Sequence, residues 1–262
     1  MTTQLSTRPP VVDLESRTDR AAPPAASMVH GSKTYGSGST EVRALDDVSV
    51  EFERACMTAI MGPSGSGKST LMQCLAGLDD LTSGEVWLGE LELSAMNERQ
   101  RTKVRRDRIG FIFQAYNLLP TLTARENILL PVRLAGQRID DQWFTSVVDR
   151  IRLSDRLRHR PSEMSGGQQQ KVAVARALLS RPAVIFADEP TGNLDSRSGA
   201  EVLQLLRQAV DDLGQTVVMV THDANAAAVA DRVVFLRDGR VAFEIDHPTV
   251  GVILDSMKNL SG

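Results

Sequence analysis

This sequence has few cysteines, no long apolar run and no large excess of positive or negative charge, and each of these features excludes a class of protein. Its two cysteines, Cys56 and Cys74, stand in apolar surroundings, so we expect core thiols in a reducing cytoplasm rather than a disulfide framework. No apolar run approaches the ~20 residues that cross a bilayer, and no charged-then-apolar secretion signal opens the chain, so we expect it to be soluble by itself. The formal net charge of −3 argues against a dedicated nucleic-acid binder.

What is present is an ordinary globular composition, with 42% hydrophobic and 24% charged residues, enough to bury a core. At about 150 residues per domain, a chain of 262 residues predicts one large domain, or one domain with a lobe. Residues 1–27 contain several prolines and no apolar period, so we predict a disordered tail there. The folded domain is predicted to cover residues 28–262.

From Met28 onward, short β-rich runs alternate with helical stretches, which predicts an α/β fold with a mainly parallel sheet. The pair Asp238-Gly239 between two apolar runs predicts a hairpin turn. From Thr123 to about Met164 only helical spacing occurs, so we expect a helical lobe, at about 115–180, inserted between strands. The expected strands are Val42–Phe52, Met57–Met61, Glu85–Leu93, Ile109–Phe113, Ala183–Ala187, Thr216–Thr221 and Arg232–Leu236. The expected helices are Lys68–Leu78, Ala124–Ala135, Gln142–Leu153, Gly167–Leu179, Ser198–Leu213 and Ala224–Ala230.

The segment Gly62–Ser69 fits the phosphate-binding pattern G-x-x-x-x-G-K-[ST] in full, between a predicted strand and a predicted helix. Its glycines let the backbone wrap tightly, so that N–H groups and the start of the helix point at phosphate oxygens. Lys68 then reaches the β and γ phosphates, and the Ser69 hydroxyl can ligate Mg²⁺. The alternative, a glycine- and serine-rich turn, is disfavoured by the flanking strand and helix. The nucleotide-binding residues expected here are Gly62, Ser64, Gly65, Ser66, Gly67, Lys68, Ser69 and Thr70.

An acidic pair, Asp188-Glu189, follows the apolar run Ala183–Ala187. In α/β sheets that end of a strand faces the ligand crevice, so Asp188 can hold Mg²⁺ and Glu189 can orient or deprotonate an attacking water. Alone, the pair is a weak signal and is better explained as a solvated strand end. Together with the phosphate-binding segment, it predicts a nucleotide-hydrolysing site.

The segment Glu163–Gln170, E-M-S-G-G-Q-Q-Q, resembles the signature motif of ABC-type ATPases, with Met164 where the family has Leu. Ser165 can cap the following helix, and Gly166 and Gly167 expose backbone N–H groups to an anion. The alternative interpretation is an ordinary helix capped by Ser165, with no role in binding. The resemblance implies that Ser165, Gly166, Gly167 and Gln168 bind nucleotide.

Further positions match the same family one at a time, in the family's order. Tyr35 resembles the aromatic residue that stacks on adenine, although a lone tyrosine beside a strand is often a packing residue. Gln114 resembles the glutamine that touches Mg²⁺ and water, Leu194-Asp195 the loop that crosses the dimer interface, and His222 the histidine that contacts the γ-phosphate and positions Glu189. The resemblance implies a P-loop ABC ATPase fold, with an antiparallel β part and the inserted helical lobe. It also implies Glu189, His222 and Lys68 as catalytic residues and Ser69, Gln114 and Asp188 as magnesium ligands.

Two stretches, residues 110–123 and 188–195, look like the macrolide-export and lipoprotein-release (MacB/LolD-like) group of this family, with Lys171 where that group shows Arg. This resemblance implies an ATPase that uses ATP and Mg²⁺, closes head to tail on a second copy of itself, and serves a separate integral-membrane permease of MacB/LolD/FtsX-like type. Its expected location is the cytoplasmic face of the cell membrane, bound through the permease, with residues 115–127 on the transmitting surface and no nucleic acid as partner.

Two other functions remain open at this stage. A cell-division type signalling complex would use the same ATPase chemistry. A soluble ABC ATPase acting on ribosomes or nucleic acid fits less well, because this chain has one cassette and neither a long coiled-coil insertion nor a cysteine cluster. Two basic clusters, residues 99–108 and 150–160, could face anionic lipid or the permease, but a solvated helix face is the simpler interpretation.

Overall fold

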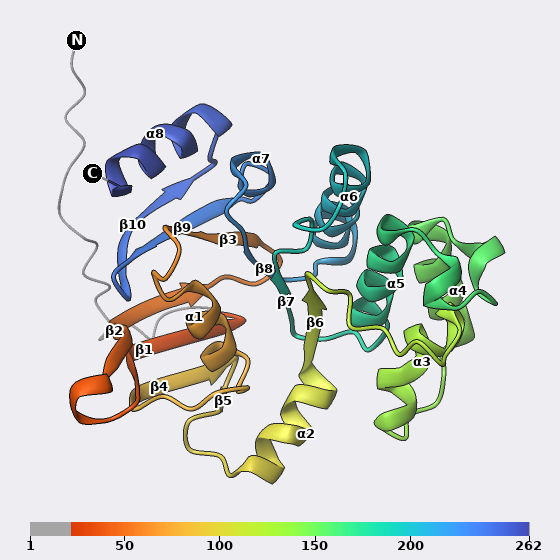
Figure 1. The fold of residues 1–262 in the computed structure, drawn as a ribbon. Helices are drawn as coiled ribbons and strands as arrows, with labels where there is room; N and C mark the ends of the chain where they lie inside the picture. Colours follow the sequence, from red (N-terminus) through yellow and green to blue (C-terminus); the bar gives the residue numbers. More distant parts are fainter. Residues whose placement is uncertain (1–21, 262) are drawn as a thin grey trace.

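The buried apolar runs of the chain form a six-stranded sheet with the order β10-β9-β3-β8-β7-β6, in a computed structural model that describes residues 22–261 (Figure 1). Strands β3, β8, β7, β6 and β9 run parallel, and β10 pairs antiparallel to β9 at one edge. Continuous apolar runs suit such strands because helices or a second sheet cover both faces. The bounds are β3 Met57–Met61, β6 Ile109–Phe113, β7 Val184–Asp188, β8 Val217–Val220, β9 Arg232–Arg237 and β10 Arg240–Asp246.

A second, antiparallel sheet has the order β2-β1-β4-β5. Its strands are β1 Ala26–Tyr35, β2 Val42–Phe52, β4 Ser83–Leu88 and β5 Leu91–Glu92. The register of β1 shifts three times against β2, so this strand twists and bulges along its length.

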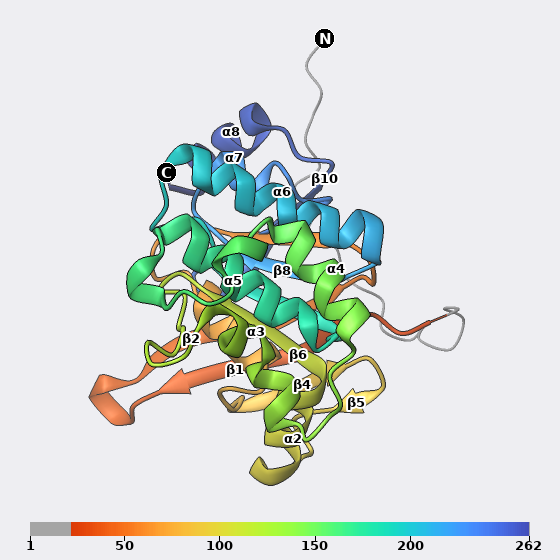
Figure 2. The ribbon, with the colours of Figure 1, turned by 90° about the vertical axis from the view of Figure 1, so that its right-hand side faces the viewer.

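Helices connect and cover the two sheets (Figures 1 and 2). They are α1 Lys68–Leu75, α2 Glu98–Arg108, α3 Ala124–Leu134, α4 Asp141–Ile151, α5 Gly166–Leu179, α6 Ser196–Leu213, α7 Ala224–Ala227 and α8 Val250–Ser261. Short 3-10 turns occupy Gly38–Thr40, Ser154–Arg156 and Pro161–Glu163. Helices α3, α4 and α5 follow β6 and precede β7, which is the stretch where the sequence predicts helices alone.

The six-stranded sheet separates two hydrophobic cores. Alternate residues of β7 show this division, since Ile185 and Ala187 face one core while Val184 and Phe186 face the other. The first core takes its helical side chains from α3 to α8, and the second from α1 together with the antiparallel sheet. Helices α1 and α5 therefore cover opposite faces of the parallel strands, and Figure 2 views the face that carries α4, α5 and α6.

Most predicted elements are confirmed, and three corrections follow. Residues 1–21 of the predicted tail lie outside the described residues, but Ala26 and Ser27 belong to β1, where both are buried. The tail prediction is wrong at Ala26 and Ser27. These small side chains are buried in the sheet, but they do not produce the apolar period by which a strand is recognised in the sequence. The single strand predicted at Glu85–Leu93 is two strands, since Gly89 takes a left-handed φ of 59° and turns the chain. The elements β1, α2, β10 and α8 were not predicted with bounds, although the hairpin turn expected at Asp238-Gly239 implies a strand where β10 lies.

The basic cluster at 99–108 lies on α2, which buries none of its residues, in line with a solvated helix face. Several of its guanidinium groups are paired, for example Arg105 with Glu98 and Arg106 with Asp107. Within residues 22–261, none of the helices has both the length and the hydropathy that a bilayer crossing requires.

Candidate nucleotide-binding site

The candidate site lies where the parallel strands end. Strand β3 leads into Gly62, β6 into Gln114, β7 ends on Asp188 and is followed by Glu189, and β8 leads to His222. Because these strands are parallel neighbours, their carboxyl ends lie along one edge of the sheet, which is where ligands bind in open α/β sheets. Four segments that are far apart in sequence are thereby brought to one place.

The phosphate-binding segment needs its glycines for two reasons. Gly62 has φ 150° and Gly67 has φ 98°, both in the region that side chains rarely adopt. A Cβ on Gly62 would also collide with the carbonyl oxygen of Leu236, and one on Gly67 with that of Ala44. Any other residue at either position would force the loop away from its neighbours.

The loop presents backbone donors without acceptors. Among the described residues, the N–H groups of Gly65, Gly67, Lys68 and Ser69 donate to no carbonyl, and the last two lie at the start of α1. The Ser66 hydroxyl oxygen is buried and likewise has no hydrogen-bond partner in the described part of the chain. Converging free N–H groups at a helix start are the ordinary means of holding phosphate, so this loop suits a polyphosphate.

Lys68 spans the loop. Its Nζ donates to the carbonyl oxygens of Gly62, at 2.9 Å, and Pro63, at 2.7 Å. Burial lowers the pKa of this ammonium, although the Glu189 and Asp188 carboxylates act in the opposite direction. A partly desolvated cation facing two carboxylates would gain from the negative charge of a phosphate.

Glu189 is held at the mouth of the site by its backbone and by His222. The chain at Glu189 has a φ of 46°, which is strained for a residue with a side chain, and its N–H donates to Val220 at 2.9 Å. His222 Nδ1 donates to Glu189 Oε1 at 2.8 Å. The Glu189 side chain is only 18% exposed, whereas that of His222 is 72% exposed and borders a cavity of about 410 Å³ with Glu189. A carboxylate fixed in this way can take a proton from a water bound beside it.

The donor set at this edge fits a magnesium ion. Mg²⁺ prefers one or two protein oxygens together with phosphate oxygens and water, rather than a cage of carboxylates. Ser69 and Asp188 offer a hydroxyl and a carboxylate, and residues 22–261 contain no group of three or more His, Cys, Asp or Glu placed to hold a metal ion by themselves. Burial, and then the nearby Glu189 charge, raise the pKa of Asp188, so a cation beside it would stabilise its ionised form.

Gln114 is tied to the segment that follows Glu189. Its Nε2 donates to Asn193 Oδ1 at 3.2 Å, and Asn193 Nδ2 donates back to the Gln114 carbonyl at 3.1 Å. The Tyr116 hydroxyl also donates to the Asn193 carbonyl. Asn193 was not predicted as a site residue, because its partner lies 79 positions away and no local pattern marks the pair.

The signature segment is ordered by hydrogen bonds within itself. Ser165 Oγ accepts from the N–H of Gln168, and Gln168 Oε1 accepts from the N–H of Ser165, so the two form a capping box at the start of α5. Side chains on Gly166 and Gly167 would meet Tyr116 and Ser198, respectively. In the described part of the chain, no hydrogen bond joins this segment to residues 62–70.

Tyr35 is held by two residues that were not predicted to belong to the site. Its hydroxyl donates to Asp79 Oδ2 at 2.6 Å, and Lys33 donates to Asp79 Oδ1, also at 2.6 Å. The Lys33 ammonium also lies 4.7 Å from the centre of the Tyr35 ring. Burial alone would raise the pKa of Asp79, but the hydrogen bonds from Lys33 and Tyr35 hold it below its usual range. This arrangement fixes an aromatic ring that is 39% exposed, as a stacking surface requires.

We predict that Tyr35→Ala weakens ATP binding about fivefold or more, because stacking of a base on an aromatic ring contributes about 1–3 kcal/mol. Tyr35→Phe keeps the ring and loses only the hydroxyl bond to Asp79, so its affinity should stay within about twofold of wild type. Titration with a fluorescent ATP analogue measures both. An Ala variant that binds as tightly as wild type would return Tyr35 to a packing role.

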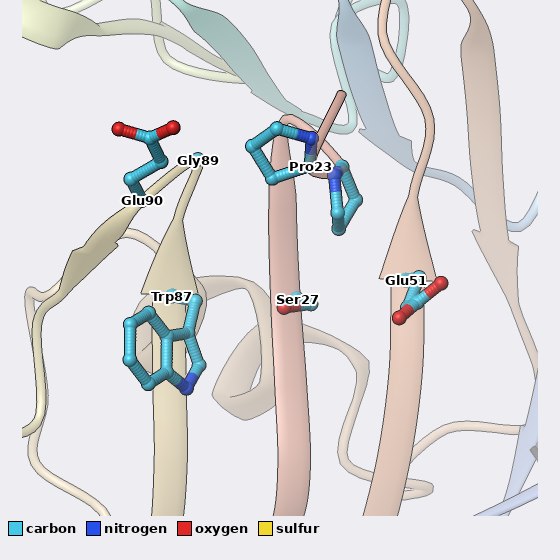
Figure 3. Close-up of a pocket in the computed structure, with 7 residues that line it drawn as sticks. Pro23, Ser27, Glu51, Trp87, Gly89 and Glu90 are labelled. Carbon is cyan, nitrogen blue, oxygen red and sulfur yellow. The ribbon is translucent and has the colours of Figure 1, made fainter. Parts of the chain in front are cut away.

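A separate hollow, lined by none of the predicted site residues, opens on the antiparallel sheet (Figure 3). Ser27, Glu51 and Trp87 are cross-strand neighbours there, on the face opposite Ala26 and Met28, which contact the core. It is also lined by Pro23, Pro24, Gly89 and Glu90.

The fold and the site together define a P-loop nucleotide-binding ATPase. The family model described as ABC transporter matches residues 45–192, and the chain belongs to that family. Over 218 residues it is 41% identical to an uncharacterised ABC transporter ATP-binding protein, MJ0796 of Methanocaldococcus jannaschii, covering 81% of this chain and 93% of the relative. The chain is an ABC ATPase, and the ABC ATPase fold predicted from the sequence is confirmed by the solved structures described next.

Two further relatives belong to the macrolide-export and lipoprotein-release systems. The chain is 45% identical to the macrolide export ATP-binding/permease protein MacB of Burkholderia thailandensis, over 87% of this chain and 35% of that protein. It therefore spans about a third of the MacB relative. It is 46% identical to the lipoprotein-releasing system ATP-binding protein LolD 1 of Chlorobium chlorochromatii, over 76% of this chain and 82% of the relative.

Solved structures agree with this placement. A dimeric post-hydrolysis state of the ATP-binding cassette MJ0796, bound to ADP and Pi, superposes with a TM-score of 0.77 at 39% identity and covers 86% of this chain and 99% of that one. The cbiO1 protein of Clostridium perfringens, part of an ABC transporter complex, superposes with a TM-score of 0.79 over 91% of this chain and 95% of that one, at 24% identity, which supports the fold alone.

Proposed function

We propose that this chain hydrolyses ATP with Mg²⁺ between two copies of itself and thereby powers a separate integral-membrane permease of MacB/LolD/FtsX-like type. One observation carries the dimer: within residues 22–261, no hydrogen bond joins the phosphate-binding loop to the signature segment of the same chain. Head-to-tail association would place Ser165–Gln168 of one copy over the Lys68 of the other. The dimeric state of the MJ0796 cassette supports this arrangement.

Each residue then has a role in phosphoryl transfer. The free N–H groups of the loop and Lys68 would stabilise phosphate charge, while Ser69, Asp188 and Gln114 would hold Mg²⁺, which neutralises negative charge on the phosphates when bound. Glu189, oriented by His222, would accept the proton of the attacking water. Closing the dimer excludes bulk water and aligns these groups.

Residues 28–262, with β1 extended to Ala26, would act as one ABC ATPase domain, and the helical lobe at about 115–180 as its moving part. A groove beside that lobe offers a docking place for the permease. It is lined from α2, β6, α3 and α5, and includes the exposed Leu78 and Leu134 as well as Asn117 of the expected transmitting segment. Arg105 and Arg106, which are paired with Glu98 and Asp107, border the same groove, so an amphipathic segment with its apolar side on Leu78 and Leu134 would fit it.

We predict that Leu134→Asp reduces permease-stimulated ATPase activity at least severalfold, because a charge replaces a side chain that is 66% exposed in the groove. Basal ATPase activity should not change, since Leu134 is exposed at the end of α3 and is not one of the site residues. Val252→Asp is the matched control, as Val252 is 47% exposed on α8 and lies outside the groove. Equal stimulation of both variants would place the permease elsewhere.

Isolation of the native complex decides the partner. We expect an integral-membrane permease to co-purify and to hold the ATPase at the cytoplasmic face of the membrane. A permease that binds cell-wall enzymes and moves no cargo would favour the cell-division type of complex. Ribosomes or nucleic acid in place of a membrane protein would overturn the proposal.

A further inference from the structure

Gln170 lies entirely inside the protein, at 0% exposure, in the second turn of α5. Its side-chain amide spans two segments that belong to the catalytic edge. The Nε2 group donates to the carbonyl oxygen of Pro190 at 2.6 Å and to that of Phe113 at 3.4 Å. Pro190 directly follows Glu189, and Phe113 directly precedes Gln114.

The orientation of this amide follows from its partners. Backbone carbonyls only accept hydrogen bonds, so the NH₂ half of the amide must face them. The Oε1 atom is buried and has no hydrogen-bond partner in the described part of the chain. The two bonds donated by Nε2 are thus the polar contacts that hold this side chain. If the amide were turned over, its oxygen would face two carbonyl oxygens and repel them.

The position of Gln170 links it to the signature segment. Ser165–Gln168 forms the first turn of α5, and Gln170 follows it on the same rigid helix. Phe113 and Asp188 are paired at the ends of β6 and β7. The Gln170 amide therefore bridges the segments that leave these two strands, which begin with Gln114 and Glu189. A shift of α5 would therefore move both segments through a single side chain.

We propose that Gln170 is a positioning residue, which sets the places of Glu189 and Gln114 according to the position of the signature helix. This inference rests on the proposed function, in which the signature segment meets the nucleotide of a second copy. The strained backbone at Glu189, with φ 46°, makes an external restraint on Pro190 effective, because the local chain does not favour this conformation by itself.

The test replaces Gln170 with Met, which has a similar volume and no donor, in the full-length chain. We expect kcat to fall about tenfold to a hundredfold, as for a misplacement of catalytic groups by about 1 Å, while KM and the affinity for a fluorescent ATP analogue stay within about twofold. The midpoint of thermal unfolding should fall by no more than a few degrees, because the variant leaves the Pro190 carbonyl without this donor but also removes the buried Oε1 atom, which has no partner in the described part of the chain.

Gln215→Met is the matched control. Gln215 Nε2 also donates to two backbone carbonyls, those of Pro182 and Thr216, but at the opposite ends of β7 and β8. We expect its kcat to equal that of wild type. If Gln170→Met and Gln215→Met show equal kcat, the proposal is wrong although the ATPase function stands, whereas a wild-type chain without hydrolysis would refute the proposed function itself.

A second variant guards against misfolding. Gln170→Asn keeps an amide in the core but is one methylene too short to reach both carbonyls, so it should show the same selective loss of kcat. If neither variant binds the nucleotide analogue, Gln170 is needed for folding and the positioning role is overturned.

Discussion

Glu189→Gln is expected to lower kcat by about 10²–10⁴-fold, the contribution of a positioned general base. The substitution keeps the shape of the side chain and its contact with His222, but an amide does not take up the proton of the attacking water. ATP binding should persist, because Glu189 lies beside Lys68 without joining the loop that faces the phosphates. The variant should therefore accumulate as an ATP-bound dimer.

Steady-state release of phosphate measures the loss of turnover, and gel filtration with ATP and Mg²⁺ measures the dimer. Glu53→Gln makes the same chemical change on an exposed turn and should behave as wild type in both. Hydrolysis at the wild-type rate by the Glu189 variant would show that another group acts as the base.

Lys68→Ala is expected to weaken ATP binding by about ten- to a hundredfold, since a hydrogen bond to a charged group contributes about 1.5–3 kcal/mol. The fold should tolerate the change. The Ala variant loses the hydrogen bonds of Lys68 to the Gly62 and Pro63 carbonyls, but burial lowers the pKa of Lys68, so removal of the partly desolvated charge offsets that loss.

Titration with a fluorescent ATP analogue reports the affinity, and thermal unfolding without nucleotide reports the stability. Lys103→Ala is the control, as it removes the same charge from an exposed site on α2. Wild-type affinity in the Lys68 variant would mean that the loop does not bind phosphate.

How much the sequence predicts depends on how local the signal is. Strands β2, β3 and β6 were predicted to the residue, because each is an apolar or alternating run bounded by turn residues. Strand β1 was not predicted, because its register shifts against β2 interrupt the regular alternation of buried and exposed side chains. Helix α8 carries a helical spacing, Ile253, Met257 and Leu260, that could have revealed it.

The candidate site shows the same division. Gly62–Ser69 and Asp188-Glu189 were predictable because each is a short motif whose chemistry is complete within a few residues. The pairs Tyr35–Asp79, Gln114–Asn193 and Gln170–Pro190 arise only when the sheet brings distant segments together. Sequence reasoning therefore identified the groups expected to touch the nucleotide, and His222 beside Glu189, but missed Asp79, Asn193 and the contact of Gln170 with Pro190.

The capping box at the start of α5 has a consequence for how readily two subunits engage and separate. A serine hydroxyl has one hydrogen and two lone pairs, and the cap uses a lone pair of Ser165 to accept from Gln168. The hydroxyl hydrogen of Ser165 stays available to a phosphate oxygen, so this residue can bind a triphosphate while it still caps the first turn of α5. The segment is already preorganised by intramolecular bonds when the protomers meet, and its ordering adds little entropic penalty to each association cycle.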